Sequence, residues 1–567
     1  MAAAPGTARP DTASIDTART LVGVCREVVD AAAARLARSC VADGRIDVAL
    51  LDREQVLAYD LATTAGQVSA AEHMLAYGEQ GNLQALLTVV FAGHVAADLV
   101  RRIAGREHDW GADQAHDAHD GHDGHQAPDG KIGGWRTQPF DAALRVARSP
   151  ALLEAVAEQV LRDPELPRRL DEQMQLVRGT FRDFTEARVV PIAEHVHRAD
   201  ADIPEDLIVE LAAMGCFGLS IPERHGGFAA GDLLSMVVVT EELSRGSLGA
   251  AGSLITRPEI VARALLAGGT DEQRARWLPG IAAGELMCAV AVTEPDHGSD
   301  VADLQVRAVR DGEDYVINGV KTWCTFAGRA DLLLLLARTG APQDGHRGLS
   351  LLVVEKPPAA GHAFAHVAQA GGRLDARAIP TIGYRGMHSF ELSFEDFHVP
   401  ARNLVGGDGG LGRGFYLQLD AFAGGRLQTA ARATGVMQAA FEQAVSYAAQ
   451  RQVFGIALAD YQLTRAKLAT MAALIAACRQ FSYRVAELLG AGGGQREAAM
   501  VKSVSCLAAE WLTREAQQLH GGMGYAEEYA VSRYFVDARV LSIFEGADEV
   551  LALRVVVRHL LEGALAG

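Results

Sequence analysis

One carboxylate near the end of the chain has the surroundings of a general base. Glu545 follows the apolar pair Ile543-Phe544 and precedes Gly546. A carboxylate among apolar side chains is harder to ionise than one in water, so it can take a proton from a substrate near neutral pH. The same local pattern also suits a surface glutamate that opens a helix, and the rest of the chain has to separate the two interpretations.

Two further segments have the residue types that hold a flat, polar ring. Thr293 and Ser299 supply hydroxyls in a predicted turn over residues 292–300. Trp323 and Thr325 lie two residues apart in a predicted strand, which would place both side chains on one side of it. An indole face with neighbouring hydroxyls suits a heteroaromatic ligand, although an ordinary turn and an ordinary core strand would explain each segment taken singly.

The elements that must position these residues follow from the apolar periodicity. Residues 15–105 and 171–284 repeat apolar side chains at steps of three and four, and the same pattern returns from residue 413 onward. Between them, short β-rich runs alternate with Gly, Asp and Pro. These runs predict strands at 288–292, 314–318, 332–337, 349–355 and 390–394. The chain is therefore predicted to be mainly helical, with one β domain inserted between two helical halves.

Composition limits the possible functions. The 567 residues carry a net charge of −18, which argues against a broad nucleic-acid-binding face. The seven cysteines form no CxxC pair, so neither a disulfide framework nor a cysteine zinc site is indicated, and a reducing cytoplasm is expected. We find no signal peptide and no apolar run of the ~18 residues needed to span a bilayer.

A segment rich in His, Asp and Gly, residues 108–134, interrupts the helical pattern. Its histidines are His108, His116, His119, His122 and His125. They could bind a metal ion, but the segment has few apolar residues to fix the geometry of ligands. We interpret it as a solvated linker and predict no metal site.

Several segments together resemble the acyl-CoA dehydrogenase family. They are the turn at 292–300, the strand at 319–325, and the C-terminal runs at 451–455, 518–525 and 544–546. The resemblance covers roughly residue 171 to the end of the chain. It implies an N-terminal α domain (171–285), a middle β-barrel domain (286–403) and a C-terminal four-helix bundle (404–567). An extra N-terminal helical region (1–107), the linker and a helical connector (135–170) would precede them.

The resemblance implies FAD as the cofactor, held between the β and C-terminal domains and completed by a neighbouring subunit of a homodimer or homotetramer. The implied contacts to the flavin and its pyrophosphate are Val292, Thr293, Ser299, Trp323 and Thr325. Those to the adenine dinucleotide end are Arg451, Phe454, Gln462, Gln518 and Gly522. The chain departs from the family at Ala547 and Glu549, where Thr and Gln are common, so FAD contacts there are not expected.

The resemblance also assigns the base. Some branches carry it on the helix around 420–432, just before an arginine, but here that position is Gly425, before Arg426. Glu545 occupies the commoner position. The implied reaction is α,β-dehydrogenation of an acyl-CoA, with Ser299, Phe544 and Gly546 also near the substrate, and with an electron-transferring flavoprotein as electron acceptor.

Segments at 256–260, 347–350, 383–387, 426–432 and 543–549, together with the long N-terminal region, resemble one branch of this family. The implied substrate is (2S)-methylsuccinyl-CoA and the product mesaconyl-C1-CoA, in the ethylmalonyl-CoA pathway. Its distal carboxylate needs a cation. Arg257 is the first candidate, Arg385 and Arg426 are the others, and a surface Arg257 paired with Glu259 is the alternative.

Two other functions remain open at this point. A short-chain or branched-chain acyl-CoA dehydrogenase would keep the fold and FAD but have an apolar pocket without a buried arginine. A DNA-associated flavoprotein of the same fold would need a basic C-terminal patch, which the acidic composition disfavours.

Overall fold

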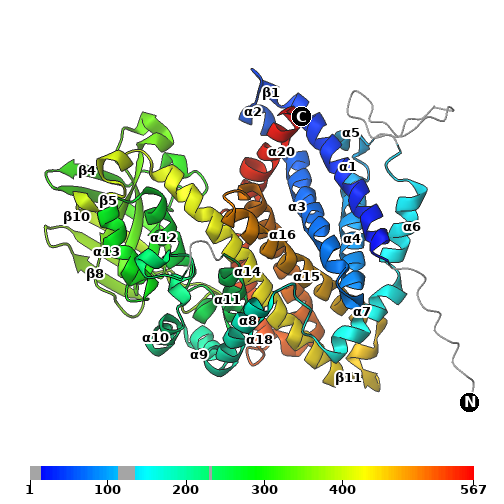
Figure 1. Ribbon diagram of the computed structural model, residues 1–567. Coiled ribbons are helices and arrows are strands. Elements are labelled where there is room, and N and C mark those ends of the chain that lie inside the picture. Colours follow the sequence, from blue (N-terminus) through cyan, green and yellow to red (C-terminus); the bar gives the residue numbers. More distant parts are fainter. Residues whose placement is uncertain (1–13, 113–133, 229–232, 567) are drawn as a thin grey trace, which may run out of the picture.

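The computed structural model describes residues 14–112, 134–228 and 233–566. The histidines at 116, 119, 122 and 125 lie outside the described residues. Along the chain, helices are followed by an eight-stranded sheet and then by helices again, as the periodicity predicts. Figure 1 shows the sheet at one end of the molecule and the first helices at the other.

The N-terminal region consists of long helices that join the C-terminal bundle. Its main helices are α1 (Ile15–Ser39), α3 (Gln55–Gly78), α4 (Asn82–Ile103), α6 (Gln138–Ala147) and α7 (Pro150–Arg162). Helices α3, α4 and α7 pack on α15 (Gln462–Gly490), and α3 also packs on α16 (Gln495–His520). One continuous hydrophobic core therefore serves both regions.

Among the described helices, α4 alone is long and apolar enough, by length and composition, to cross a bilayer. Of its most apolar window, 61% is buried inside the protein. A core helix of a globular domain meets the same criteria, and α4 packs against α1, α3 and α6.

A second group of helices connects this region to the sheet. It comprises α8 (Glu172–Phe184), α9 (Val190–Ala199), α10 (Glu205–Ala213), α11 (Leu233–Gly246), α12 (Thr256–Gly268) and α13 (Asp271–Ala282). Helices α12 and α13 share a core with the leucine-rich strands of the sheet, including Leu332, Leu334 and Leu351. This packing fixes α12 beside both the sheet and the C-terminal helix α14 (Gly414–Gln450).

The sheet runs in the order β3-β6-β4-β5-β10-β9-β8, with β7 also paired to β6. The strands are β3 (Cys288–Ala291), β4 (Arg307–Asp311), β5 (Asp314–Thr325), β6 (Leu332–Arg338), β7 (Leu349–Glu355), β8 (Ala363–Val367), β9 (Arg373–Ala378) and β10 (Ser389–Pro400). All five predicted strands are present. Strands β4, β8 and β9 were not predicted: β4 and β9 have many exposed, polar positions, and β8 exposes apolar residues.

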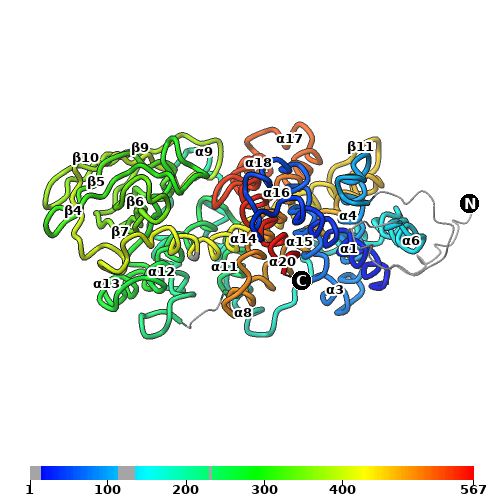
Figure 2. The backbone as a smooth tube through the Cα atoms, turned by 90° about the horizontal axis from the view of Figure 1, so that it is seen from above, coloured from blue at the N-terminus to red at the C-terminus, as the bar shows by residue number. Residues whose placement is uncertain are grey.

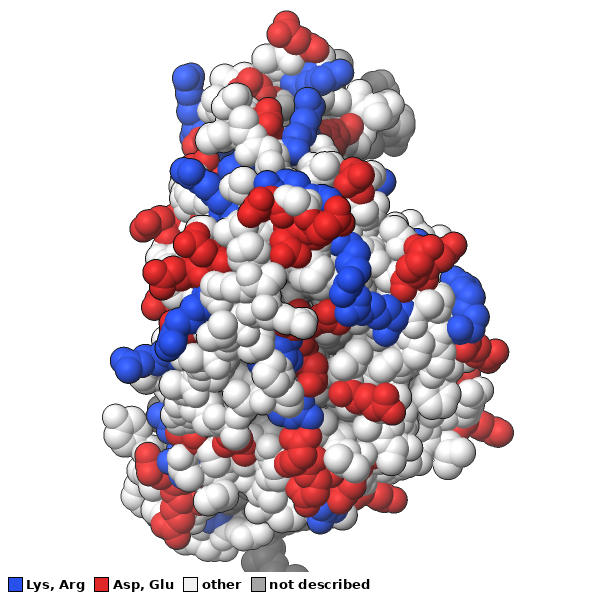
Figure 3. Space-filling model, turned by 90° about the vertical axis from the view of Figure 1, so that its left-hand side faces the viewer, with Lys and Arg blue, Asp and Glu red and all other residues white. Residues whose placement is uncertain are grey.

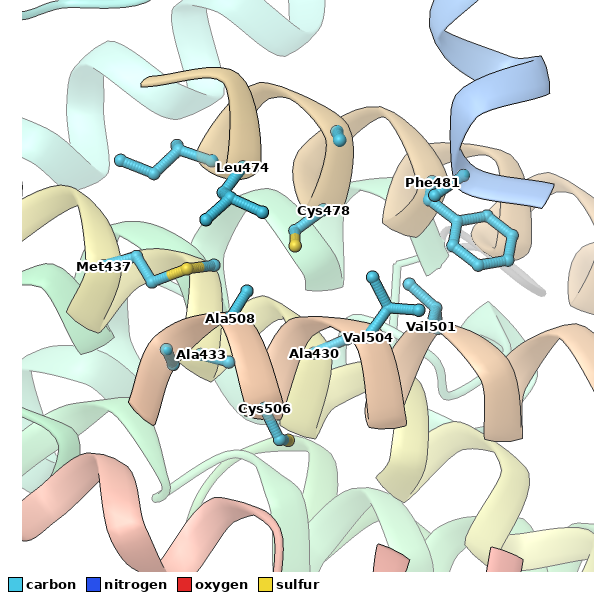
Figure 4. Close-up of a cluster of buried hydrophobic side chains, with 14 of the residues drawn as sticks. Ala430, Ala433, Met437, Leu474, Cys478, Phe481, Val501, Val504, Cys506 and Ala508 are labelled. Atoms are coloured by element: carbon cyan, nitrogen blue, oxygen red, sulfur yellow. The ribbon is translucent and has the colours of Figure 1, made fainter. Parts of the chain in front are cut away.

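The C-terminal bundle is formed by α14, α15, α16 and α18 (Ala530–Leu541), followed by α19 (Asp548–Leu551) and α20 (Val557–Ala566). Helix α14 runs from the sheet into the bundle in both views (Figures 1 and 2). In Figure 4, side chains from α14, α15 and α16 meet in the bundle core, for example Met437, Cys478 and Val504. This core packs α14 against α16, and both helices contact the loop that carries Glu545.

Candidate functional site

Glu545 lies in the loop between α18 and α19. Its backbone is left-handed, with φ +56°, and Gly546 follows with φ +97°. A non-glycine residue in this conformation costs about 1–2 kcal/mol, and such strained residues gather at functional sites. Lys502 of α16 donates to the carbonyl of Gly546 at 2.8 Å, which holds the turn in place. The Glu545 side chain is 7% exposed, so it is not a surface glutamate.

The Glu545 carboxylate lies against Gly425 of α14. A Cβ added to Gly425 would stand 3.2 Å from Oε2 of Glu545 and 3.4 Å from Cδ1 of Ile260. The absence of a side chain at residue 425 therefore makes the space that the carboxylate uses. The two sequence positions at which the family resemblance allows a base meet at one point in the structure.

Four buried cationic side chains surround this carboxylate. Nη1 of Arg257, from α12, is 3.7 Å from Oε1 of Glu545. Arg426 and Arg432 of α14 and Lys502 are also buried. Burial lowers the pKa of Arg426, Arg432 and Lys502, and the negative charge of Glu545 opposes that shift in each case. Buried Asp548 also acts on Lys502, so these four cations outnumber the two carboxylates beside them.

Some of the donors in this site have no acceptor within the described residues. They are Nη1 of Arg257, Nε of Arg426 and Nε of Arg432. Leaving a charged donor buried without a hydrogen bond is costly, so a site of this kind favours an anionic ligand that supplies the acceptors.

Arg432 also fixes the residue before the base. Its guanidinium lies 4.7 Å from the centre of the Phe544 ring, and Tyr384 meets the same ring edge-on. Arg432 in turn donates to Ser253 at 3.2 Å and to Thr429 at 2.6 Å. The contact between Arg432 and Phe544 therefore ties the Glu545 loop to α14.

The structure separates the three arginines considered for the distal carboxylate. Arg257 is buried beside Glu545, and Glu259 pairs with Arg263 instead. Arg426 is buried, and the charge of Glu545 acts on it. Arg385 bonds the carbonyls of Thr381 and His197, so it is engaged elsewhere. Arg432 and Lys502 were not predicted to lie here, because cations on helices are usually exposed and only packing buries these two.

The 292–300 turn is held beside β5 by a buried lysine. Nζ of Lys321 bonds the Val292 carbonyl at 2.7 Å and Glu294 at 2.8 Å. The Thr322 amide donates to the Thr293 carbonyl at 2.8 Å. Thr293 is half-buried and Ser299 is exposed, so both hydroxyls lie at or near the surface next to the end of β5.

Trp323 and Thr325 differ in exposure although they are two residues apart. Trp323 has φ +58° and an exposed fraction of 54%, whereas Thr325 is buried and bonds the Ser389 hydroxyl at 2.9 Å. The register with β10 shifts between Phe390 and Leu392, opposite this segment, and such a bulge interrupts strand alternation. The exposed indole beside the 292–300 turn offers a flat surface with hydroxyls nearby, which fits the flavin ring of FAD.

The remaining implied FAD contacts lie elsewhere in the chain. Arg451, Phe454, Gln462, Gln518 and Gly522 are exposed, and Phe454 is 96% exposed. Arg451, Phe454 and Gln462 flank the hairpin of β11 (Gln452–Val453), which lies at the opposite side of the molecule from β5 (Figures 1 and 2). Gln518 lies in the last turn of α16, and Gly522 begins α17 (Gly522–Tyr525). The structure of one chain does not bring these residues to Trp323.

The face at the sheet end of the molecule carries mixed charges. Figure 3 shows acidic and basic side chains interspersed on this face. A DNA-binding surface needs clustered Lys and Arg, and the face in view does not have that clustering.

Comparisons with known proteins agree with this architecture. Three family models match the chain: the acyl-CoA dehydrogenase N-terminal domain at 171–285, the middle domain at 289–397 and the C-terminal domain at 412–561. The chain is 38% identical to a (2S)-methylsuccinyl-CoA dehydrogenase of Cereibacter sphaeroides, over 92% of this chain and 93% of that protein.

Two solved structures are also similar. Butyryl-CoA dehydrogenase from Megasphaera elsdenii has a TM-score of 0.63 and 30% identity, covering 69% of this chain and 98% of the other. A chain in a structure described as the electron-transferring flavoprotein of Acidaminococcus fermentans has a TM-score of 0.63 and 30% identity, covering 70% and 99%. Three family models match in order along the chain, and the middle one covers the sheet. The chain therefore belongs to the acyl-CoA dehydrogenase family of FAD-dependent oxidoreductases that act on a CH–CH group.

Proposed function

We propose that this enzyme converts (2S)-methylsuccinyl-CoA to mesaconyl-C1-CoA, with Glu545 as the base and Arg257 as the partner of the distal carboxylate. The buried Arg257, 3.7 Å from Glu545, carries the proposal. The similarity to the Cereibacter sphaeroides dehydrogenase supports it, because that similarity extends over the N-terminal helical region as well.

In this proposal Glu545 removes the α-proton of the thioester. Its carboxylate is buried and fixed between Gly425 and Arg257, which keeps water away and limits its movement. When bound, FAD would supply the hydride-accepting chemistry at the β-carbon. Val292, Thr293, Ser299, Trp323 and Thr325 are the residues we assign to the flavin side, and Phe544 and Gly546 border the substrate beside the base.

The distal carboxylate has a specific physical effect in this site. In the free enzyme, Arg257 lies near Glu545 but at 3.7 Å their pairing is loose. A substrate carboxylate at Arg257 would supply the missing acceptor and leave Glu545 free to take the proton. A neutral acyl group would leave the guanidinium unpaired, and a site with an unpaired buried charge rejects such a ligand by more than one methyl group could.

We further propose a homo-oligomer and an electron-transferring flavoprotein as electron acceptor. The exposed Arg451, Phe454, Gln462, Gln518 and Gly522 are then the part of the FAD site that a second copy completes. The similarity to the Acidaminococcus fermentans structure supports the proposed electron acceptor.

Anaerobic titration with a panel of acyl-CoA thioesters, read by flavin bleaching, tests the substrate. We expect kcat/KM for methylsuccinyl-CoA to exceed that for butyryl-CoA. Arg257→Met removes a buried charge partner, at a cost of about 2–5 kcal/mol, so kcat/KM for methylsuccinyl-CoA should fall by about 10²-fold or more. Activity on butyryl-CoA should change little or rise.

Arg263→Met is the matched control, because Arg263 lies on the same helix but pairs with Glu259. It should leave the preference between the two substrates unchanged. Equal loss of both substrates in Arg257→Met would make Arg257 structural and Arg426 the next candidate. A wild-type preference for butyryl-CoA would favour a short-chain acyl-CoA dehydrogenase instead.

A further inference from the structure

Three side chains from separate segments meet where the helices of residues 171–285 join the sheet. Asp200 ends α9, His362 immediately precedes β8, and His388 immediately precedes β10. One potential ligand atom from each lies within 4.8 Å of the other two. None of these residues contacts the Glu545 site in the described structure, and the proposed reaction does not use them.

The spacing of the three side chains is close to that of metal ligands. Nδ1 of His388 is 3.7 Å from Oδ1 of Asp200, and Nε2 of His362 is 3.9 Å from Oδ2 of the same carboxylate. The two imidazole rings are 4.4 Å apart, edge to face. Ligands of one tetrahedral ion with bonds of about 2.0–2.2 Å lie about 3.3 Å apart. Inward shifts of less than about 1 Å would therefore let all three bind one ion.

The second ring nitrogen of His388, Nε2, is buried and lies beside Asp202 rather than Asp200. The His388 side chain is 8% exposed, and Nε2 makes no hydrogen bond of acceptable geometry within the described residues. Oδ1 of Asp202 is nevertheless 3.1 Å from that nitrogen. A carboxylate beside the second nitrogen is the usual partner of a metal-binding histidine, because it orients the ring and raises its basicity.

Asp202 is itself held in place by the His362 segment. Its Oδ2 accepts from the amide of Gly361 at 2.7 Å. The side chain that would orient His388 is thus tied to the residue before His362. The arrangement links all three segments.

The cluster also has room for a further ligand. Asp202 and His388 line a cavity of about 370 Å³, together with Phe326, Arg329 and Met387. Of the three proposed ligands only His388 lines this cavity, so a water molecule or small anion that completes a tetrahedral site would approach from the His388 side.

We propose that Asp200, His362 and His388 bind one divalent transition-metal ion of the zinc class, with Asp202 as the positioning residue for His388. Two imidazoles and a carboxylate are a donor set that Zn²⁺ accepts. The ion would join α9 to the sheet. It would also lie close to Thr325, because the amide of the next residue, Phe326, donates to the carbonyls of Met387 and His388.

The competing interpretation is a network of charged and hydrogen-bonded side chains that holds no metal ion. Nε of Arg385 is 3.7 Å from Oδ1 of Asp200, and Nε2 of His362 is 3.0 Å from the Asp200 carbonyl. These contacts would neutralise Asp200 and occupy His362 without any ion. Stoichiometric metal binding separates the two interpretations.

The experiment must first remove the other histidines that could bind the ion. We would use the full-length, FAD-loaded chain in which His116, His119, His122 and His125 are replaced by Asn, after treatment with a chelator. Titration with Zn²⁺, and with Co²⁺ as a spectroscopic probe, should give one tight equivalent and a tetrahedral Co²⁺ spectrum. The unfolding temperature should rise when Zn²⁺ is added.

His388→Ala and His362→Ala in that background should abolish the tight equivalent, and Asp202→Asn should weaken it by about 10–100-fold. His398→Ala is the matched control, since His398 pairs with Asp314 at 3.2 Å in the same domain but has no third ligand among the described residues. This variant should bind Zn²⁺ as tightly as the protein with only the four linker histidines replaced. If His388→Ala does not fold, the half-exposed His362 provides the test. Absence of a tight equivalent, or its retention in His362→Ala and His388→Ala, would overturn the proposal.

Discussion

Glu545 and Gly425 are direct neighbours: Oε2 of the glutamate lies 3.2 Å from the point where a Cβ on Gly425 would be. One is in the loop after α18 and the other on α14. A side chain from either element could therefore place a carboxylate at the same point in the site. In this chain the loop supplies the carboxylate, and Gly425 of α14 leaves the space free for it.

Glu545→Gln should retain the fold and FAD but lose dehydrogenation. The amide is nearly the same shape and cannot accept the proton, and loss of a general base costs about 10²–10⁴-fold in rate. The rate of single-turnover flavin reduction under anaerobic conditions measures this loss of dehydrogenation. Glu549→Gln, at an exposed position in the next helix, is the control and should react normally. A Glu545→Gln variant that reduces flavin at the wild-type rate would rule out Glu545 as the base.

Moving the carboxylate to α14 should restore part of the activity. Glu545→Gly empties the space beside Gly425 and should be inactive. Adding Gly425→Glu should then raise the rate by about tenfold or more, since each 1.36 kcal/mol recovered is a factor of ten. Single-turnover flavin reduction rates are compared between Glu545→Gly and the double variant. If the double variant is no faster than Glu545→Gly alone, the two positions do not share a proton-transfer point.

The extra N-terminal region should influence the catalytic loop through Tyr59. Its hydroxyl donates at 2.6 Å to Asp548, three residues after Glu545. Tyr59→Phe removes a hydrogen bond to a buried carboxylate, so the free energy of unfolding should fall by about 1.5–3 kcal/mol and kcat should fall with it. Urea unfolding and steady-state kinetics measure the two effects.

Tyr77→Phe is the control for that variant. Tyr77 lies on the same helix but donates to the Pro167 carbonyl, away from the loop. It should reduce stability without a matching change in kcat. Equal kinetic effects in both variants would mean that only general destabilisation is at work.

Stability should depend on pH through Lys356. Burial lowers the pKa of Lys356 from 10.5 to about 8. Between these values the unfolded chain binds the proton and the folded chain does not, so this group makes the free energy of unfolding rise with pH. Lys356→Met lacks this contribution, and the wild type should gain stability relative to it from pH 8 to about 10. A constant difference across that range of urea titrations would contradict the assigned shift.

The sequence by itself determined the order of the elements and the family. Apolar periodicity is a local property, so the helix–sheet–helix order and the strands with apolar runs, such as 332–337 and 349–355, could be predicted. Strands β4, β8 and β9 could not, because their exposed positions dilute the alternating pattern. Glu545 was a candidate base because its apolar neighbours and Gly546 are contiguous in the chain, and the family resemblance, not the local pattern, selected it over a surface glutamate.

Only the tertiary structure decided what surrounds that carboxylate. Arg432 and Lys502 lie on long helices, where charged residues are usually exposed, and helix packing alone buries them beside Glu545. The bulge opposite Trp323 likewise depends on the pairing of β5 with β10 and cannot be read from a spacing of two residues. Asp200, His362 and His388 are far apart in the chain, and a site made from distant segments leaves no local pattern, because the contacts that define it form only when α9 docks on the sheet.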